Sequence, residues 1–209
     1  MASKVEIFNL ALGRIGAEST IESFDENSTE AGYARAVYNP NREATLREHD
    51  WGFARQYVLL VKLAAPIARR WVFAYKYPNT AVRVIDIERP QTSATVFTND
   101  PDEVRTVSDQ IAYEVAQDAD GVRSIHCNLD NAIARVTVDE QEPSKFDPSF
   151  VDALAWRMAK ELATTLGART DYYTLASREY EGAIERAKSA TGKENASLNE
   201  EAAAIKARR

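Results

Sequence analysis

The feature that most constrains this chain is a change of periodicity near residue 50, where a polar helical segment is followed by closely spaced aromatic residues. These aromatic residues are Trp51, Phe53, Trp71, Phe73, Tyr75 and Tyr77. Their alternate positions are typical of strands, in which successive side chains point to opposite faces. Because no catalytic motif accompanies them, we predict that Trp51, Phe53, Trp71 and Tyr75 are structural residues.

Helical spacing precedes this aromatic region. Ser3 followed by Glu6 is a capping-box pattern, and apolar residues at helical intervals predict a first helix over residues 4–15. A second helix is expected to begin after residues 27–28 and to end near residue 50. Pro40 lies inside it and predicts a kink or a restart.

Helical spacing returns after the aromatic region. Asp147 and Pro148 predict the start of a third helix, because Asp is a favoured N-cap and Pro is favoured at the first helical position. This helix should end at Gly167, with a fourth helix starting at Thr170. Beyond Gly192 the chain is polar, and we expect the last residues to be mostly disordered when alone in water.

Between the two helical pairs, six segments have the composition and spacing of strands. They are Tyr57–Val61, Trp71–Tyr77, Val82–Ile87, Ile111–Val115, Val122–Cys127 and Ile133–Val138. The residues Asp118–Gly121 predict a hairpin turn between two of these strands.

These elements predict an α+β fold. We expect residues 1–50 and 147–190 to form an antiparallel helical bundle and residues 51–146 to form an inserted antiparallel β-domain. Residues 191–209 would then be an extended, flexible C-terminal arm.

Composition limits the classes of function. The chain has 209 residues, a net charge of −6 and a single cysteine, which excludes an internal disulfide bond. The negative charge argues against non-specific binding to nucleic acid. No apolar run approaches the roughly 20 residues needed to span a bilayer, so we expect neither a membrane partner nor an export signal.

The negative charge is concentrated in one stretch. Residues 91–142 contain eleven acidic residues but only three arginines, a local net charge of −8. Desolvation excludes burying so many unpaired carboxylates inside one subunit. We therefore expect the stretch, including Asp100, Asp102 and Glu103, to face a DNA channel or a basic partner. Ordinary solvated loops are the alternative.

Three sets of residues suggest chemistry only weakly. His126 and Cys127 are adjacent, but a zinc site needs three or four ligands, so we predict no metal site and a buried structural cysteine. Glu18, Glu22 and Asp25 resemble an acid/base set, but carboxylates in a polar loop are usually solvated. The aromatic residues could form a stacking platform for single strands, although core or interface packing fits the acidic surroundings better.

Several pieces of the chain, in order, resemble one protein family. They are Asn9–Gly16, Ala36–Tyr38, Arg42–Trp51, Phe53–Ala54, Trp71–Pro78, Arg83–Val84, Phe146–Leu162, Tyr180–Glu181 and Ala187. Together they resemble the tail tubular protein A-like head-to-tail adaptors (head-completion or connector proteins) of tailed bacteriophages.

The resemblance implies a non-enzymatic virion protein without a cofactor, made in the host cytoplasm and placed at the head–tail junction. Such proteins form a ring, generally of twelve copies, that connects the portal to the tail or nozzle and lets double-stranded DNA pass without specific binding. In this setting we expect the C-terminal arm to bind the portal. Its candidate residues are Thr191, Leu198, Ile205, Arg208 and Arg209.

Two other functions stay open at this point. Some adaptors of short-tailed phages are reported to degrade peptidoglycan, so a tail-associated hydrolase is the first alternative. A nucleic-acid-binding module is the second, and the net charge of −6 disfavours it.

Overall fold

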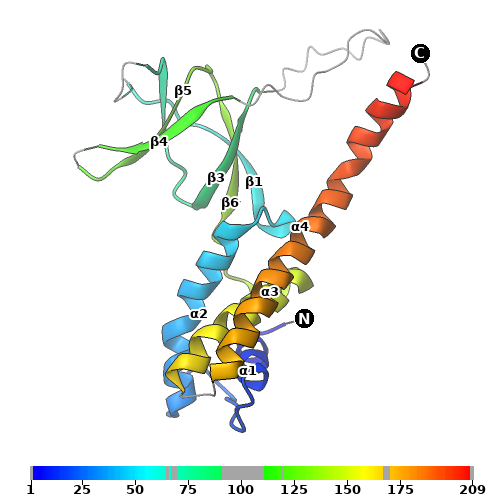
Figure 1. Ribbon diagram of the computed structural model, residues 1–209. Coiled ribbons are helices and arrows are strands. Elements are labelled where there is room, and N and C mark those ends of the chain that lie inside the picture. The colour runs from blue at the N-terminus through cyan, green and yellow to red at the C-terminus, as the bar shows by residue number, and fades with distance from the viewer. Residues whose placement is uncertain are drawn as a thin grey trace. The chain divides into compact units, whose positions relative to one another are not determined.

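The computed structural model describes residues 2–64, 66, 70–90, 111–118, 120–166 and 170–207, with side chains described up to Thr191 but not for Thr170. The fold is mixed α and β, with four helices and two small antiparallel sheets, as predicted at that level (Figure 1). The chain divides into two units. The helical unit comprises Met1–Ala54 and Glu140–Arg209, and the β unit comprises Arg55–Asp139.

The four helices begin where the capping residues predict. They are α1 (Lys4–Arg14), α2 (Thr29–Glu48), α3 (Pro148–Thr165) and α4 (Thr170–Ala207). Ser3 and Glu6 form the complete capping box, and the Ser28 side chain accepts a hydrogen bond from the backbone N–H of Ala31. The Asp147 carboxylate likewise accepts the N–H of Ser149. These bonds satisfy N–H groups that the first helical turn leaves without partners.

The restart that Pro40 could have caused does not occur. Pro40 lies inside a continuous α2, because residues such as Arg42, Thr45 and Leu46 are buried beyond it and their packing offsets the lost hydrogen bond. Beyond Gly192, where mostly disordered residues were expected, α4 continues to Ala207 and so runs for 38 residues. One interior glycine costs only about 1 kcal/mol, and good helix formers surround it.

The core of the helical unit is centred on α3, which contacts each of the other three helices. Leu154, Met158 and Leu162 are fully buried on its apolar stripe, as predicted, while Val151 at the start of that stripe is only partly buried. Gly16, just after α1, has a φ of +72° and lies against the Tyr172 side chain. A side chain at that position would be strained by both the backbone and the contact.

In its described residues, the β unit contains six strands in two three-stranded sheets. They are β1 (Arg55–Leu59), β2 (Phe73–Lys76), β3 (Ala81–Glu88), β4 (Tyr113–Gln117), β5 (Arg123–Cys127) and β6 (Ile133–Val138). The strand orders are β1-β6-β3 and β2-β5-β4, with every pairing antiparallel. The predicted turn is present, with Gly121 at a φ of +82° donating to the Asp118 carbonyl.

One extended segment connects the two sheets. Residues 55–59 pair with β6, whereas the N–H of Leu63 donates to Ala74 (2.7 Å) and the N–H of Lys76 donates to Val61 (2.8 Å). Both sheets share one apolar core, which includes Tyr75 and Ile125 from one sheet and Val136 from the other. The chain therefore builds a second core independent of the helices.

The boundary between the units differs from the expected one at both ends. Trp51 and Phe53 belong to the helical unit, where their rings meet Phe146 and Phe150 in a cluster with centroid separations of 4.9–6.4 Å. The alternation of aromatic residues predicts that residues 51–54 are part of the β-domain. These rings instead complete the helical core, because α3 supplies the apolar surface beside them.

Candidate functional site

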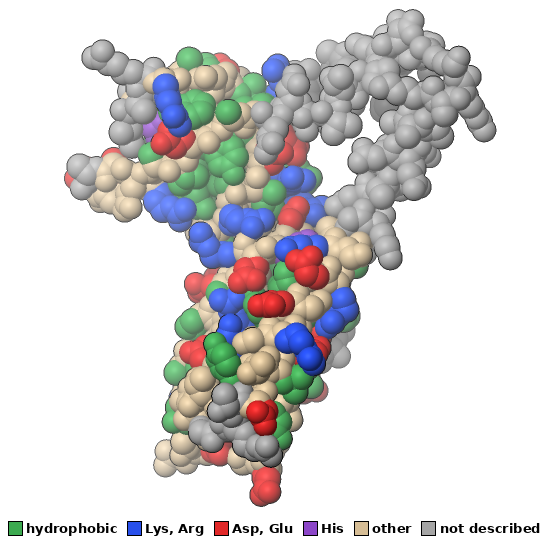
Figure 2. Space-filling view, viewed as in Figure 1, with side chains coloured by type: hydrophobic (Ala, Val, Ile, Leu, Met, Phe, Trp, Pro, Cys, Tyr) green, Lys and Arg blue, Asp and Glu red, His purple; other side chains and the backbone are tan. Residues whose placement is uncertain are grey.

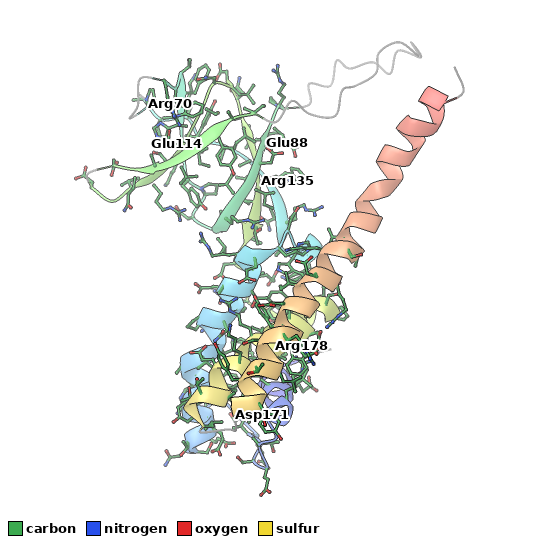
Figure 3. All side chains as sticks on the ribbon, in the orientation of Figure 1. Arg70, Glu88, Glu114, Arg135, Asp171 and Arg178 are labelled. Carbon is green, nitrogen blue, oxygen red and sulfur yellow. The ribbon has the colours of Figure 1, made fainter. Side chains whose placement is uncertain are left out.

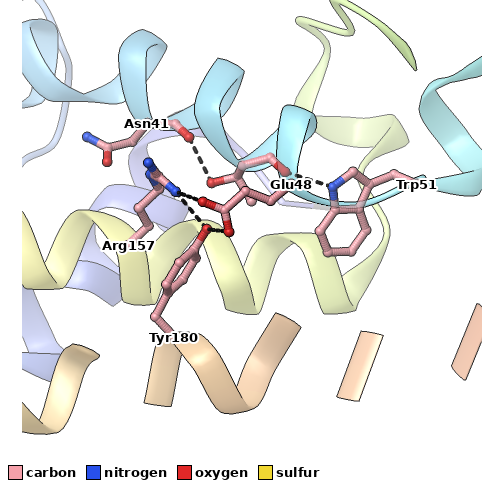
Figure 4. A network of polar contacts seen from close by, with 6 residues as sticks. Asn41, Glu48, Trp51, Arg157 and Tyr180 are labelled. Carbon is pink, nitrogen blue, oxygen red and sulfur yellow. Dashed lines mark hydrogen bonds and ion pairs between the residues drawn. The ribbon is translucent and has the colours of Figure 1, made fainter. Parts of the chain in front are cut away.

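The most connected polar cluster of the helical unit joins α2, α3 and α4 (Figure 4). The carboxylate of Glu48 accepts hydrogen bonds from Arg157 and from the Tyr180 hydroxyl, each at 2.6 Å. The Arg157 guanidinium also donates to the Tyr180 oxygen at 2.7 Å. Each helix thus contributes one side chain, and every member of this triad contacts the other two.

Burial and hydrogen bonding set the charge states of this triad. Burial, reinforced by the hydrogen bond to Glu48, raises the pKa of Tyr180 to about 12. Burial alone would lower the pKa of Arg157, but its bonds to Glu48 and Tyr180 raise it above the ordinary value. At neutral pH the tyrosine is therefore a protonated donor and the arginine stays charged. The triad therefore holds three helices together through charge-assisted hydrogen bonds.

An open pocket of about 350 Å³ lies beside this triad. Its polar lining includes Asn41, whose amide donates to the Glu161 carboxylate and to the Val37 carbonyl. Lys160 lies over the Tyr173 ring, with 5.6 Å from Nζ to the ring centroid. Because these polar groups bond to each other across the helices, the pocket wall is a set of interhelical contacts.

Arg42 is the largest fully buried side chain of the described residues. Its guanidinium donates to the carbonyl of Glu140 at 2.6 Å, at the point where the chain re-enters the helical unit. Trp51, at the other crossing, donates its indole N–H to the Thr45 carbonyl at 2.9 Å. Trp51 and Arg42 therefore fix, within the helical unit, the places where the chain leaves for the β unit and returns from it.

The pieces that resemble the adaptor family have packing roles. Asn9 makes two hydrogen bonds of 2.9 Å to the backbone of Ile21, which closes the connection after α1. Arg14 pairs with Asp152 and lies 4.1 Å from the Trp156 ring, so it ties α1 to α3. These residues fix the helix arrangement.

The predicted structural aromatics divide into two groups. Trp51 and Tyr75 are buried, and the Tyr75 hydroxyl donates to the Leu129 carbonyl at 2.7 Å. Phe53 is partly buried in the aromatic cluster. Trp71 was expected on the same strand as Tyr75, but it precedes β2 and is only half-buried. Since Trp51, Tyr75 and Tyr77 are buried, these rings do not form an exposed platform for bases.

A polar cluster lies on the side of the β2-β5-β4 sheet that faces away from the core. The Glu114 carboxylate accepts hydrogen bonds from the Trp71 indole (2.7 Å) and Arg70 (2.8 Å) (Figure 3). The bond from Trp71 is the main cause that lowers the pKa of Glu114. His126, directly opposite Glu114 in the ladder, is 1% exposed and bonds through Nε2 to the Ser124 hydroxyl at 2.8 Å.

Ser124, His126 and Glu114 have the residue types of a catalytic triad but lack one of its hydrogen bonds. A triad needs the acid to bond to the second ring nitrogen of the histidine. Here His126 Nδ1 has no hydrogen-bond partner within the part of the chain that is described, and Glu114 bonds to Trp71 and Arg70 instead. The Ser124–His126 bond is therefore a buried polar contact.

Neither weak candidate from the sequence gathers into a site. Cys127 is buried and unpaired, and burial raises the pKa of its thiol. No group of three potential metal ligands occurs among the described residues. Glu18, Glu22 and Asp25 are all exposed, in the connection between α1 and α2.

Described carboxylates of the acidic stretch mostly have cationic or capping partners. Three of them pair with bases outside the stretch: Glu114 with Arg70, Asp130 with Lys62, and Glu140 with Lys145. Asp118 accepts two backbone N–H groups of its own turn. The count of −8 therefore overstates the charge available to a partner. Asp100, Asp102 and Glu103 lie outside the described residues.

The expected arm begins inside a helix. Thr191 is part of α4, and its hydroxyl lies 2.9 Å from Nε2 of His49, at the end of α2. Leu198 and Ile205 are also in α4, but their side chains are not described, and Arg208 and Arg209 lie outside the described residues.

Sequence reasoning missed the Glu48–Arg157–Tyr180 triad, because Glu48 is more than one hundred residues away from both Arg157 and Tyr180 and no motif links them. It also missed a stripe of exposed apolar residues along the outer face of the first extended segment. These are Tyr57, Leu59, Val61 and Leu63. Apolar residues occupy both parities in 57–61, so the sequence pattern predicts a strand there but not which of its side chains face outward.

No described helix is both long enough and apolar enough to cross a membrane. Comparison with models of known protein families finds no match to this chain, and comparison with curated proteins finds none either.

Proposed function

We propose that this chain is a structural component of a tailed-bacteriophage particle, one subunit of a ring that connects the portal to the tail. The ring has about twelve copies by resemblance, lies at the head–tail junction, and lets double-stranded DNA pass through its central channel. The subunit is made in the host cytoplasm, uses no cofactor and performs no catalysis.

The observation that carries the proposal is the packing role of the residues that carry the resemblance. Asn9, Arg14 and Trp51 each close a contact between segments of the helical unit. An assembly subunit needs such rigidity, because every copy must present the same surfaces to its neighbours. In this proposal the four helices act as an antiparallel bundle and the β unit as its inserted domain.

Electrostatics are compatible with a DNA channel. Each Lys or Arg contact to phosphate adds affinity that would retard the passing duplex. The chain has a net charge of −6, and its described acids mostly pair within the subunit. Any repellent wall would therefore be supplied by Asp100, Asp102 and Glu103, with a docking role for these residues as the alternative.

The ring is tested by mass measurement with and without purified portal protein. We expect a species of about twelve chains, each of 23.3 kDa, that binds the portal as a unit. A chain that stays monomeric in both samples contradicts the proposal.

The arm is tested by deleting residues 191–209. We expect portal binding to be lost while the helical and β units stay folded, since Ala187 is the last buried residue among the side chains of α4 that are described. Circular dichroism and thermal unfolding check the fold. Unchanged portal binding would show that the arm is not the portal contact.

Two assays separate this proposal from its alternatives. A zymogram with the purified protein reports peptidoglycan hydrolysis, and we expect no clearing. A DNA-binding titration at several salt concentrations reports phosphate contacts, and we expect weak binding with a shallow salt dependence.

A further inference from the structure

One end of the β unit carries an apolar and cationic surface around the connection between β2 and β3, which we call the Pro78 surface. It has two hollows, one on each side of residues 76–79. Residues 58–61 complete a hollow of about 190 Å³, and residues 121–123 with Ala81 complete one of about 350 Å³. An occupant of this surface would contact both sides of Pro78.

The apolar part of the Pro78 surface is unusually open. Leu59, Val61 and Val122 are 65%, 67% and 50% exposed. Leu59 and Val61 belong to the outer stripe of residues 57–63, which extends for about 20 Å and whose first part lies on the edge strand β1. Natural edge strands are usually protected by charges or proline, whereas the exposed side chains of this one include Tyr57 and Leu59. On the face shown in Figure 2, hydrophobic side chains gather on the β unit beside Lys and Arg side chains.

The polar part of the surface is cationic. Lys76 and Arg123 are both exposed, and neither has a carboxylate partner within the described part of the chain. The Arg123 guanidinium lies 3.9 Å from the Tyr77 ring centroid, which holds the charge beside the hollows. A complementary occupant therefore combines apolar side chains with carboxylates.

Residues 18–30 and 96–103 are two runs of this chain that have that chemistry. In residues 18–30, the apolar side chains already pack inside the helical unit. Ile21 is buried, and Phe24 packs edge-to-face on Phe8 and Tyr38. The second is Val96–Glu103, in which Val96 and Phe97 precede three acidic residues. This run lies outside the described residues.

The strand directions favour a second copy as the source of this run. The Pro78 surface lies where β3 begins and β4 ends, as its lining residues Ala81 and Gly121 show. Residues 91–110 follow the far end of β3 (Glu88) and precede the first residue of β4 (Tyr113), and β3 alone spans about 25 Å. The run is thus attached at the end of the β unit opposite to the surface.

We propose that the Pro78 surface binds the acidic, apolar run Val96–Glu103 of a second copy of this chain. The contact is heterologous, joining two different patches, and such contacts close into rings when the rotation allows. This inference rests on the proposed ring and identifies one of its subunit contacts. Val96 and Phe97 fill the hollows, and the carboxylates pair with Lys76 and Arg123.

Charge reversal with rescue tests the contact. In the full-length protein, Lys76→Glu with Arg123→Glu should weaken self-association at least about tenfold by sedimentation velocity, with unchanged circular dichroism. Adding Asp102→Lys and Glu103→Lys should restore assembly. The control reverses Arg178 and Lys188, two exposed cations of α4, and should leave assembly unchanged.

The outcomes separate this inference from the proposed function. If the double variant Lys76→Glu, Arg123→Glu still forms rings as the wild-type chain does, the proposed contact is wrong but the ring proposal stands. Disruption without rescue overturns the assigned run. A wild-type chain that is monomeric with and without portal contradicts the ring itself.

A cross-link decides between a second copy and the same copy. Leu59→Cys chains are mixed with Val96→Cys chains and oxidised, with each single variant alone as the control. We expect a covalent dimer only in the mixture. A further sample carries both cysteines in the same chain. If the cross-link forms only in that sample, the second-copy assignment is wrong.

Discussion

The two units of this chain treat their surfaces differently. In the helical unit, long polar side chains meet across helices, as in the Glu48–Arg157–Tyr180 triad, and Arg42 is fully buried on a carbonyl. Of the large hydrophobic residues that are exposed in the described part of the chain, two lie in the helical unit and seven in the β unit. The polar side chains of the helical unit thus bond within that unit, whereas the β unit exposes the larger share of apolar side chains.

The ion pairs show the same contrast. In the helical unit, the Arg14–Asp152 pair joins α1 to α3 with both side chains partly buried. In the β unit, Arg135 lies 3.8 Å from Asp86 and 4.0 Å from Glu88 within one sheet (Figure 3). Exposed pairs such as Lys62–Asp130 contribute little to stability, because solvent screens them. Polar contacts therefore specify the helix arrangement more than the sheet arrangement.

The largest expected effect follows from burial of the aromatic residues. Trp51→Ala removes a 3%-exposed ring from the helical core and its bond to Thr45, and should cost roughly 3–5 kcal/mol of unfolding free energy. Trp71→Ala removes a half-buried ring outside the β core and should cost less than half as much. Chemical denaturation of both variants measures the difference. Equal losses would contradict the contrast between the two sites.

Alkaline pH should weaken the helical unit. Tyr180 has a folded pKa of about 12 and an unfolded pKa of about 10, so the folded state retains a proton that the unfolded state releases. Its contribution is complete below pH 10 and is lost as the pH rises toward 12, by roughly 2–3 kcal/mol. Tyr180→Phe should flatten part of this decline in stability–pH curves. The remaining slope is expected from Tyr38, whose pKa burial also raises to about 12.

Removing the charge of Glu48 tests the triad directly. Glu48→Gln keeps the size of the side chain but weakens two charge-assisted hydrogen bonds, and should cost about 1.5 kcal/mol. A double-mutant cycle with Tyr180→Phe should show coupling of at least about 0.5 kcal/mol. Additive effects would mean that the triad does not act as one contact.

The smallest effect on stability is expected at the open edge of the β unit. Val61→Ser changes a side chain that is 67% exposed, so unfolding free energy should change by less than about 0.5 kcal/mol. Self-association should weaken nevertheless, because the same side chain lines the Pro78 surface. Ile125→Ser, in the buried core of the same unit, is the matched control and should destabilise strongly. A Val61→Ser variant with normal assembly would argue against this surface.

Much of the fold was predictable because it follows from local signals. Ser3 with Glu6, Ser28 and Asp147 with Pro148 mark helix starts through hydrogen bonds within a few residues. The strand order along the chain and the turn at Asp118–Gly121 also follow from short-range pattern and backbone preference. Pro40 causes no restart of α2 and Gly192 lies inside α4, because each costs less than the surrounding helix gains.

By itself, then, the sequence determined the type and order of the elements, since capping and periodicity act over a few residues. Only the tertiary structure decided that Trp51 and Phe53 complete the helical core, that Glu48 meets Arg157 and Tyr180, and that Leu59 and Val61 face outward. Each of these outcomes depends on which distant segments pack together, as in the 109 positions that separate Glu48 from Arg157. Because burial and pairing are properties of that packing, no local pattern of residues encodes them.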